Sequence, residues 1–178
     1  MALKATIYKI DLDVVDMDRN YYAEHRLTIA RHPSETDEWM MLRVLAFALN
    51  ASERLEFGKG ISDSDEPDLW LKDYAGDVEL WIELGQPDER VVAKACKRAK
   101  AVAVYAFSAR PALWWEPARA GLSRFRNLTV WHVDPKSAKA LAAMAAPTAS
   151  VQVTVQDGEA WARDGRGAEV RVELSRLA

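Results

Sequence analysis

The feature that most constrains the fold is the segment Trp39–Leu49, which reads WMMLRVLAFAL. Apart from Arg43, it is apolar on almost every face of a helix. A helix that is apolar all round is a buried helix, so the rest of the chain has to build a core around it. Ser34 precedes the helix as a good N-cap residue, and Asn50 is a plausible end.

Strand patterns lie on both sides of this helix. Residues 3–16 and 22–30 alternate apolar and polar side chains around a turn at 17–20, which predicts an N-terminal β-hairpin. Further strands are expected at 55–57, 67–71, 77–84, 101–107 and 127–133, and helices at 88–100, 110–125 and 135–146.

The tail predicts two or three additional C-terminal strands, with alternation at 151–155 and 168–174. The predicted class is therefore α/β (α+β), a mixed sheet flanked by helices. Because there is neither an internal repeat nor a long linker, we expect a single domain over 1–178.

Composition excludes several classes of protein. The chain has 178 residues, one cysteine and a net charge of −3. It has no apolar run of about 18 residues, and its start lacks the apolar region of a signal peptide, so we expect a cytoplasmic protein without membrane contact. A net negative protein can contact nucleic acid only through a local basic patch. Oligomeric state is left open.

The segment 77–84, DVELWIEL, is the clearest strand, and its two faces differ. Glu79, Trp81 and Glu83 share one face, because side chains alternate along a strand. Asp68 lies on the preceding predicted strand, and an antiparallel pairing would bring it beside Glu79 or Glu83. Clustered carboxylates suit Mg²⁺ or Mn²⁺, so the pattern predicts a metal site.

The charge distribution agrees with a phosphodiester site. Residues 50–89 hold twelve acidic and three basic residues, whereas residues 90–126 hold nine basic and one acidic residue. Metal ligands beside phosphate-binding cations are what metal-assisted cleavage of a phosphodiester needs. The alternative is that both sets of charges are ordinary solvated surfaces.

Tryptophan is abundant, with seven residues in the chain. Trp70, Trp81, Trp114 and Trp115 fall in the middle third. They serve either as core and groove-lining bulk, or, for one or two of them, as platforms that stack on a ligand or base.

Several long motifs resemble the YaeQ family. They read RHPSETDEWMMLRVLAFALNA, DEPDLW, ELWIELGQPDE and KACKRAK, and the similarity extends from the N-terminus to about Val133. That family is regarded as a variant of the PD-(D/E)XK nuclease fold with an unsettled function. The resemblance implies a nuclease-like core over about 34–133: a helix, a three-stranded antiparallel meander, a second helix and a parallel fourth strand.

Carried over residue by residue, the nuclease motif places its PD at Pro67-Asp68 and its second acid at Glu83. Both carboxylates hold the metal in such enzymes. The motif's lysine, which normally orients the attacking water and offsets charge, is replaced here by Gly85.

Three residues are candidates to replace that lysine: Gln86, one position later, and Lys94 or Lys97 on the following helix. Glu35 or Glu38, early in the buried helix, could add a carboxylate to the metal site. Each has a structural alternative: Gln86 bonds only the turn backbone, the lysines form the wet side of an amphipathic helix, and Glu35 favours the helix N-terminus electrostatically.

Two functions follow from these residues. The first is a Mg²⁺- or Mn²⁺-dependent phosphodiesterase or nuclease, in which a basic groove binds nucleic acid through Lys94, Lys97, Arg98, Arg124 and Arg126. The second is a non-enzymatic module of the same fold that binds nucleic acid or a protein.

Overall fold

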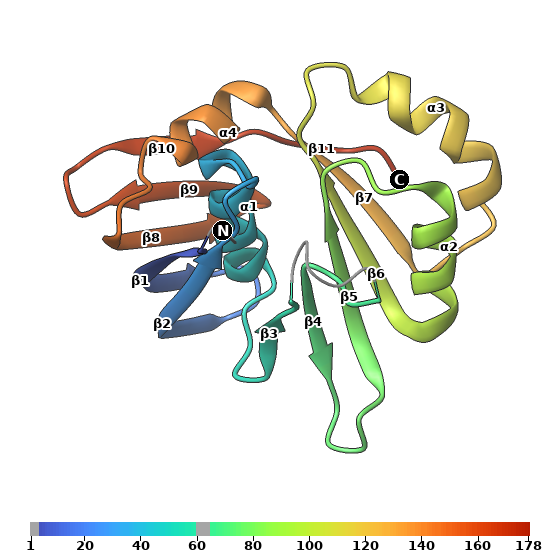
Figure 1. Ribbon diagram of the computed structural model, residues 1–178, viewed down its shortest axis with the longest axis horizontal. Coiled ribbons are helices and arrows are strands. Elements are labelled where there is room, and N and C mark those ends of the chain that lie inside the picture. The colour runs from blue at the N-terminus through green and yellow to red at the C-terminus, as the bar shows by residue number, and fades with distance from the viewer. Residues whose placement is uncertain (1–3, 60–64) are drawn as a thin grey trace. The chain divides into compact units, whose positions relative to one another are not determined.

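A computed structural model describes residues 4–59 and 65–178. The chain divides into two compact units. The first unit comprises the residues through Ala51 together with Lys136–Glu173, and the second comprises Ser52–Pro135 with Leu174–Ala178. Each unit is built around its own β-sheet (Figure 1).

The first unit contains a five-stranded sheet in the order β10-β9-β8-β1-β2. Its strands are β1 (Thr6–Asp16), β2 (Tyr21–Arg31), β8 (Thr148–Gln156), β9 (Glu159–Asp164) and β10 (Glu169–Val172). The β1–β2 pair is the predicted N-terminal hairpin, antiparallel from Thr6 opposite Arg31 to Asp16 opposite Tyr21. Among the C-terminal strands, β9 pairs antiparallel with both β8 and β10, as predicted. Strand β8 also pairs with β1, and this pairing is parallel.

Helix α1 (Asp37–Leu49) lies in this unit, and helix α4 (Pro135–Ala142) lies in it from Lys136 onward. Every residue from Met40 to Ala48 is buried, which confirms the prediction of a buried helix. Asn50 is the C-cap, as expected. The prediction that Ser34 is the N-cap was wrong: the hydroxyl of Thr36 accepts the hydrogen bond of the Trp39 N–H, at 3.1 Å. The helix begins two residues later than expected because Thr36 offers the same capping chemistry.

The second unit contains a six-stranded sheet in the order β11-β7-β6-β5-β4-β3. Its strands are β3 (Leu55–Phe57), β4 (Leu69–Lys72), β5 (Val78–Leu84), β6 (Ala99–Ala106), β7 (Leu128–Val133) and β11 (Leu174–Arg176). Strands β3, β4 and β5 form an antiparallel meander, and β5, β6 and β7 are parallel. The predicted order of meander, helix and parallel strand is therefore confirmed.

Helices α2 (Glu89–Arg98) and α3 (Pro111–Leu122) connect the parallel strands and lie along one face of this sheet (Figure 1). The core between them is apolar and contains the buried residues Trp81, Val92, Ala95, Cys96, Val102, Val104, Trp115, Ala118, Leu122 and Val130. Burial raises the pKa of the Cys96 thiol to about 11, so this cysteine behaves as a small core residue.

The spacing of Val91, Val92, Ala95, Cys96 and Ala99 predicts a common apolar side for α2, but one of these residues lies elsewhere. Val91 is 38% exposed, whereas Val92 is fully buried. The buried stripe of α2 is therefore narrower than the sequence indicated, and runs through Val92, Ala95 and Cys96. No helix in the described part of the chain has both the length and the apolar character needed to cross a membrane.

Candidate functional site

The candidate site is formed where β4 begins and β5 ends. Leu69 of β4 pairs with Ile82 of β5, so the next position outward sets Asp68 beside Glu83. The backbone of Asp68 is fixed by Gly58, whose N–H donates to the Asp68 carbonyl at 2.9 Å. Gly58 also passes so close to the chain that a Cβ there would overlap the carbonyl oxygen of Pro67. Only glycine fits at position 58 because of this close approach, and the approach holds Asp68 at the start of β4.

The Asp68 carboxylate points across to the end of β5. Its Oδ2 accepts the hydrogen bond of the Leu84 N–H at 2.8 Å. Its side chain is also hydrogen-bonded to the carboxyl group of Glu83. The predicted antiparallel pairing of these strands is thus confirmed, and it brings the two carboxyl groups into direct contact.

Glu83 is held in an environment that disfavours its charge. Burial, followed by the negative charge and hydrogen bond of Asp68, raises its pKa to about 7, although a hydrogen bond from Trp81 opposes the shift. That bond runs from the Trp81 indole N–H to Glu83 Oε1 at 2.8 Å. Near neutral pH the Glu83 carboxyl group is therefore only partly ionised.

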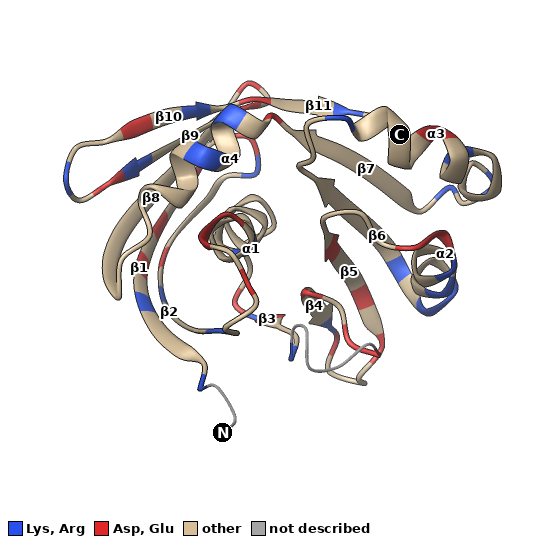
Figure 2. Ribbon diagram, turned by 45° about the horizontal axis from the view of Figure 1, so that its top comes forward, with Lys and Arg blue, Asp and Glu red and all other residues tan. Residues whose placement is uncertain are grey.

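Glu79, the other acid on this face, belongs to a different interaction. Its carboxylate forms an ion pair with Arg54 at 3.4 Å. Of the two partners that the sequence allowed for Asp68, the structure brings only Glu83 to it. Figure 2 marks acidic positions on β5 and basic positions on α2.

The motif's lysine position lies at the point where β5 ends. Gly85 has φ of +81° and donates its N–H to the Tyr105 carbonyl at 2.9 Å. A residue with a left-handed backbone conformation turns the chain out of the strand. The alternation of side chains along β5 therefore does not predict the direction of the next side chain. Gln86, that next residue, is exposed.

The three basic candidates on α2 share one exposed face. Lys94, Lys97 and Arg98 are exposed and spaced by three and four positions, which places them side by side on a helix. Lys94 Nζ lies 2.9 Å from Oδ1 of Asp65, and this contact lowers the Asp65 pKa through a hydrogen bond and charge. Arg98 lies 5.1 Å from the centre of the Trp81 ring, over the residue that donates to Glu83.

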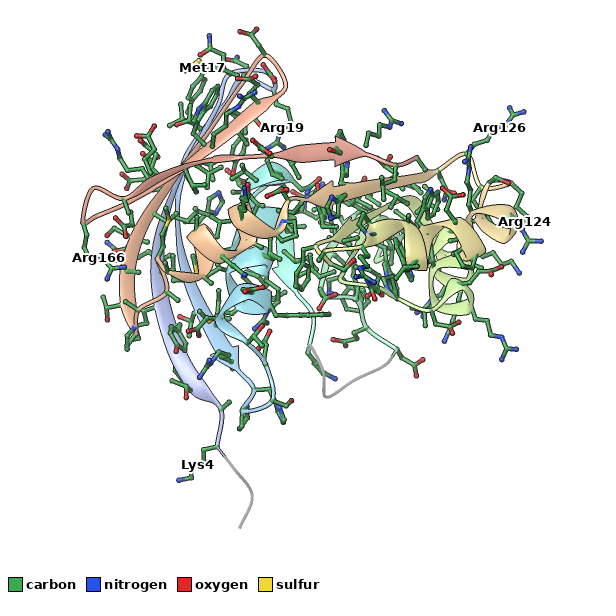
Figure 3. All side chains as sticks on the ribbon, turned by 90° about the horizontal axis from the view of Figure 1, so that it is seen from above. Lys4, Met17, Arg19, Arg124, Arg126 and Arg166 are labelled. Atoms are coloured by element: carbon green, nitrogen blue, oxygen red, sulfur yellow. The ribbon has the colours of Figure 1, made fainter. Side chains whose placement is uncertain are left out.

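The other two basic candidates follow α3. Arg124 and Arg126 are exposed, and their side chains point outward into solvent (Figure 3). Arg124 lies 4.9 Å from the Phe125 ring centre. The five bases therefore lie on exposed surfaces of the second unit, and the groove that would join them stays a prediction.

Glu35 belongs to the first unit, and its surroundings differ. It precedes the N-cap Thr36 and lies 2.7 Å from the Arg43 guanidinium, with side-chain exposures of 4% and 6%. The His32 N–H also donates to Glu35, at 3.2 Å. Glu38 lies in the first turn of α1. The sequence contained a signal for the ion pair, because a lone arginine inside an apolar helix needs a buried partner.

Asp68 and Glu83 offer carboxylate oxygens, which are the donor atoms that a hard divalent cation prefers. Within residues 4–59 and 65–178, no cluster of three or more His, Cys, Asp or Glu side chains could hold a metal ion. Mg²⁺ is usually bound by one or two carboxylates, with waters and substrate phosphates completing its octahedron. Asp68 and Glu83 match that minimal set.

Sequence reasoning missed the supporting role of Trp81. Its indole N–H fixes the Glu83 carboxyl group, and its ring packs against Trp70 with centroids 5.9 Å apart. The alternation that placed Trp81 between Glu79 and Glu83 on one face was the available signal, since side chains two apart on a strand can touch.

Comparison with known proteins assigns the fold to a single family. Residues 1–174 match the family model described as YaeQ protein. The uncharacterized protein YaeQ of Salmonella typhi is 48% identical, and that of Escherichia coli (strain K12) 46%, each over 93% of this chain and 92% of the relative.

Two solved structures agree. The crystal structure of YaeQ protein from Xanthomonas axonopodis pv. citri has a TM-score of 0.93 and 45% identity, covering 97% of this chain and 98% of that one. The structure from Pseudomonas syringae also has a TM-score of 0.93, with 34% identity and coverages of 98% and 96%.

Proposed function

This chain belongs to the YaeQ family, and we propose that it is a Mg²⁺- or Mn²⁺-dependent phosphodiesterase acting on nucleic acid. Its Asp68 and Glu83 lie side by side where β4 begins and β5 ends. The observation that carries the proposal is the direct contact of two carboxyl groups. Two such groups repel one another when both are ionised. A divalent cation relieves that repulsion by replacing the proton.

The element order supports the same proposal. An antiparallel meander, a helix and a parallel strand make up the core that the PD-(D/E)XK resemblance implies, with Asp68 and Glu83 at the two acid positions. Fold alone does not set activity, so the argument rests on the carboxyl pair.

In this proposal Asp68 and Glu83 hold the metal. A divalent cation bound there would polarise a phosphoryl oxygen and lower the pKa of a bound water. The Leu84 N–H and the Trp81 indole keep the two carboxylates oriented. The motif's lysine position is occupied by Gly85. In its place, the residues that would orient water or offset charge on the phosphate are Gln86, Lys94 and Lys97.

Cleavage assays test the proposal. Wild type with Mn²⁺ should cleave single- or double-stranded DNA or RNA, and Asp68→Asn or Glu83→Gln should abolish cleavage while the fold survives. Glu79→Gln is the matched control, because it removes a carboxylate from the same face of the same strand but leaves the pair intact. A wild type that cleaves none of these substrates, or acid variants as active as wild type, would refute it.

A second candidate function has its own support. Gly85 replaces the motif's lysine, and Lys94 is already paired with Asp65. Both facts favour a non-enzymatic module that binds nucleic acid or a protein and keeps the acids. The two functions separate on the wild type with Mn²⁺, because only the enzyme cleaves. Where cleavage is found, Lys94→Ala tests the role of this cation: cleavage should fall by about 100-fold or more while Mn²⁺ affinity is retained.

A further inference from the structure

The β4–β5 hairpin carries a line of aromatic and cationic side chains that leads from the carboxyl pair to the hairpin turn. It contains Trp81, Trp70, Lys72 and Tyr74 of the hairpin, together with Arg54, which packs on it from the turn before β3. From these contacts we infer that this line, the hairpin platform, binds unpaired bases of a single-stranded nucleic acid. The inference rests on the proposed function, because it names the form of nucleic acid that the same site would take.

The inner end of the platform adjoins the site. Trp81 donates to Glu83 and is buried, whereas its edge-to-face partner Trp70 is only partly buried. The Lys72 ammonium lies 3.6 Å from the centre of the Trp70 ring. Trp81 is thus part of the core, and Trp70 with Lys72 forms the part of this end that solvent reaches.

The outer end is presented by a well-fixed turn. Asp73 accepts hydrogen bonds from the N–H groups of Ala75 and Asp77, both at 2.9 Å, and Gly76 adopts φ of +91°. Tyr74 on this turn is 96% exposed. The turn joins β4 to β5 at the end of the hairpin that lies away from Asp68 and Glu83 (Figure 1).

Arg54 ties the outer end together. Its guanidinium lies 4.9 Å from the Tyr74 ring centre and also donates to the Lys72 carbonyl. It is paired with Glu79, while Asp73 is occupied by the turn and by Lys100 at 3.5 Å. Glu79 and Asp73 therefore each have a cation partner within the protein.

The chemistry of the platform distinguishes its ligand. Exposed rings beside cations offer stacking to bases and attraction to phosphates. A duplex keeps its bases stacked on one another, so only an unpaired strand can lay a base on Tyr74 or Trp70. A lone exposed tyrosine would be an ordinary surface residue, but two cation–aromatic contacts, Lys72 with Trp70 and Arg54 with Tyr74, on a hairpin that leads to a carboxyl pair form a built surface.

Binding of a labelled oligothymidylate, followed by fluorescence anisotropy in EDTA, tests the inference without metal or cleavage. Tyr74→Ala should weaken binding by about 5- to 150-fold, the loss of one base–aromatic stack, and Tyr74→Phe should restore it. Tyr22→Ala is the matched control, since Tyr22 is 58% exposed but lies on β2 of the first unit. A Tyr74→Ala protein that binds as tightly as wild type, or a wild type that binds a hairpin duplex equally well or binds no oligothymidylate, would overturn the inference.

A substrate without bases separates this inference from the proposed function. Hydrolysis of bis(p-nitrophenyl) phosphate with Mn²⁺ should be lost in Asp68→Asn and unchanged in Tyr22→Ala. Hydrolysis without Tyr74-dependent binding would remove only the platform. Tyr74-dependent binding without hydrolysis would keep the platform and remove the phosphodiesterase.

Discussion

Glu35 and Glu83 are both carboxyl groups taken largely out of water, one in each unit, but the protein surrounds them differently. Glu35 faces the guanidinium of Arg43 at 2.7 Å. Glu83 faces a second carboxyl group, that of Asp68, and its pKa is raised to about 7. The first charge is compensated within the protein, whereas the second is disfavoured by burial and by the neighbouring carboxyl group. Of the acids predicted as metal ligands, Glu83 is therefore the one whose surroundings disfavour its ionised form.

The largest effect that this comparison predicts is on stability. Arg43→Met should lower the free energy of unfolding by about 3–5 kcal/mol, because it leaves the Glu35 carboxylate buried without its cation. Urea denaturation measures the loss, and the double variant Arg43→Met/Glu35→Gln should recover most of it. Arg163→Met is the control: its ion pair with Glu169 is exposed, and its loss should cost under about 1 kcal/mol. Equal losses for both arginines would show that the Glu35 pair is no more structural than a surface contact.

Metal should act on the other pair. With Mn²⁺ at one hundred times its Kd, the wild-type protein should gain about 2.7 kcal/mol in unfolding free energy, because a ligand that binds only the folded state stabilises it. Asp68→Asn and Glu83→Gln should lose this gain, and Glu79→Gln should keep it. Thermal denaturation with and without Mn²⁺ is the measurement. A gain that survives in Asp68→Asn would place the metal elsewhere.

The pH dependence sharpens the contrast further. Since the folded state raises the Glu83 pKa from 4.5 to about 7, it holds this proton more tightly than the unfolded chain does. Stability from this group is therefore present at low pH and is lost as pH rises from about 4.5 through about 7. Relative to wild type, Glu83→Gln should gain on the order of 3 kcal/mol across this window in metal-free buffer. A difference between the two proteins that does not change with pH would refute the raised pKa.

The smallest predicted effect concerns the start of α1, next to Glu35. Thr36→Ala should cost about 1 kcal/mol, because it removes the hydroxyl that caps the Trp39 N–H. Ser34→Ala should change the free energy of unfolding by less than about 0.5 kcal/mol. Denaturation of both variants under one set of conditions decides between the caps. A larger loss at Ser34 would contradict the assignment of Thr36.

Local patterns predicted most of the individual elements. Alternation and turn residues predicted the β1–β2 hairpin, and an apolar face on all sides predicted the burial of α1. The pairing of β8 beside β1 could not be predicted, because it joins segments separated by more than half of the chain and no local signal specifies it. The pairing of β11 with β7 was also missed, because β11 is only three residues long and its partner is distant in sequence.

The candidate site was predictable in part for a similar reason. A short turn at 73–76 forces β4 and β5 to pair, which brings Asp68 to Glu83. The sequence did not show which acids have internal partners. Glu79 and Glu35 find Arg54 and Arg43 only through tertiary packing, so a list of acids from sequence includes both structural and functional candidates.

A crystal soaked in Mn²⁺ tests the central claim most directly, because Mn²⁺ scatters anomalously and can be located without a model of the site. The account predicts one anomalous peak between Asp68 and Glu83, with a carboxylate oxygen of each at about 2.1–2.3 Å. Soaks of Glu79→Gln should show the same peak, and soaks of Asp68→Asn should show none. Saturating Mn²⁺ that leaves no peak between these carboxyl groups in the wild-type protein would contradict the account.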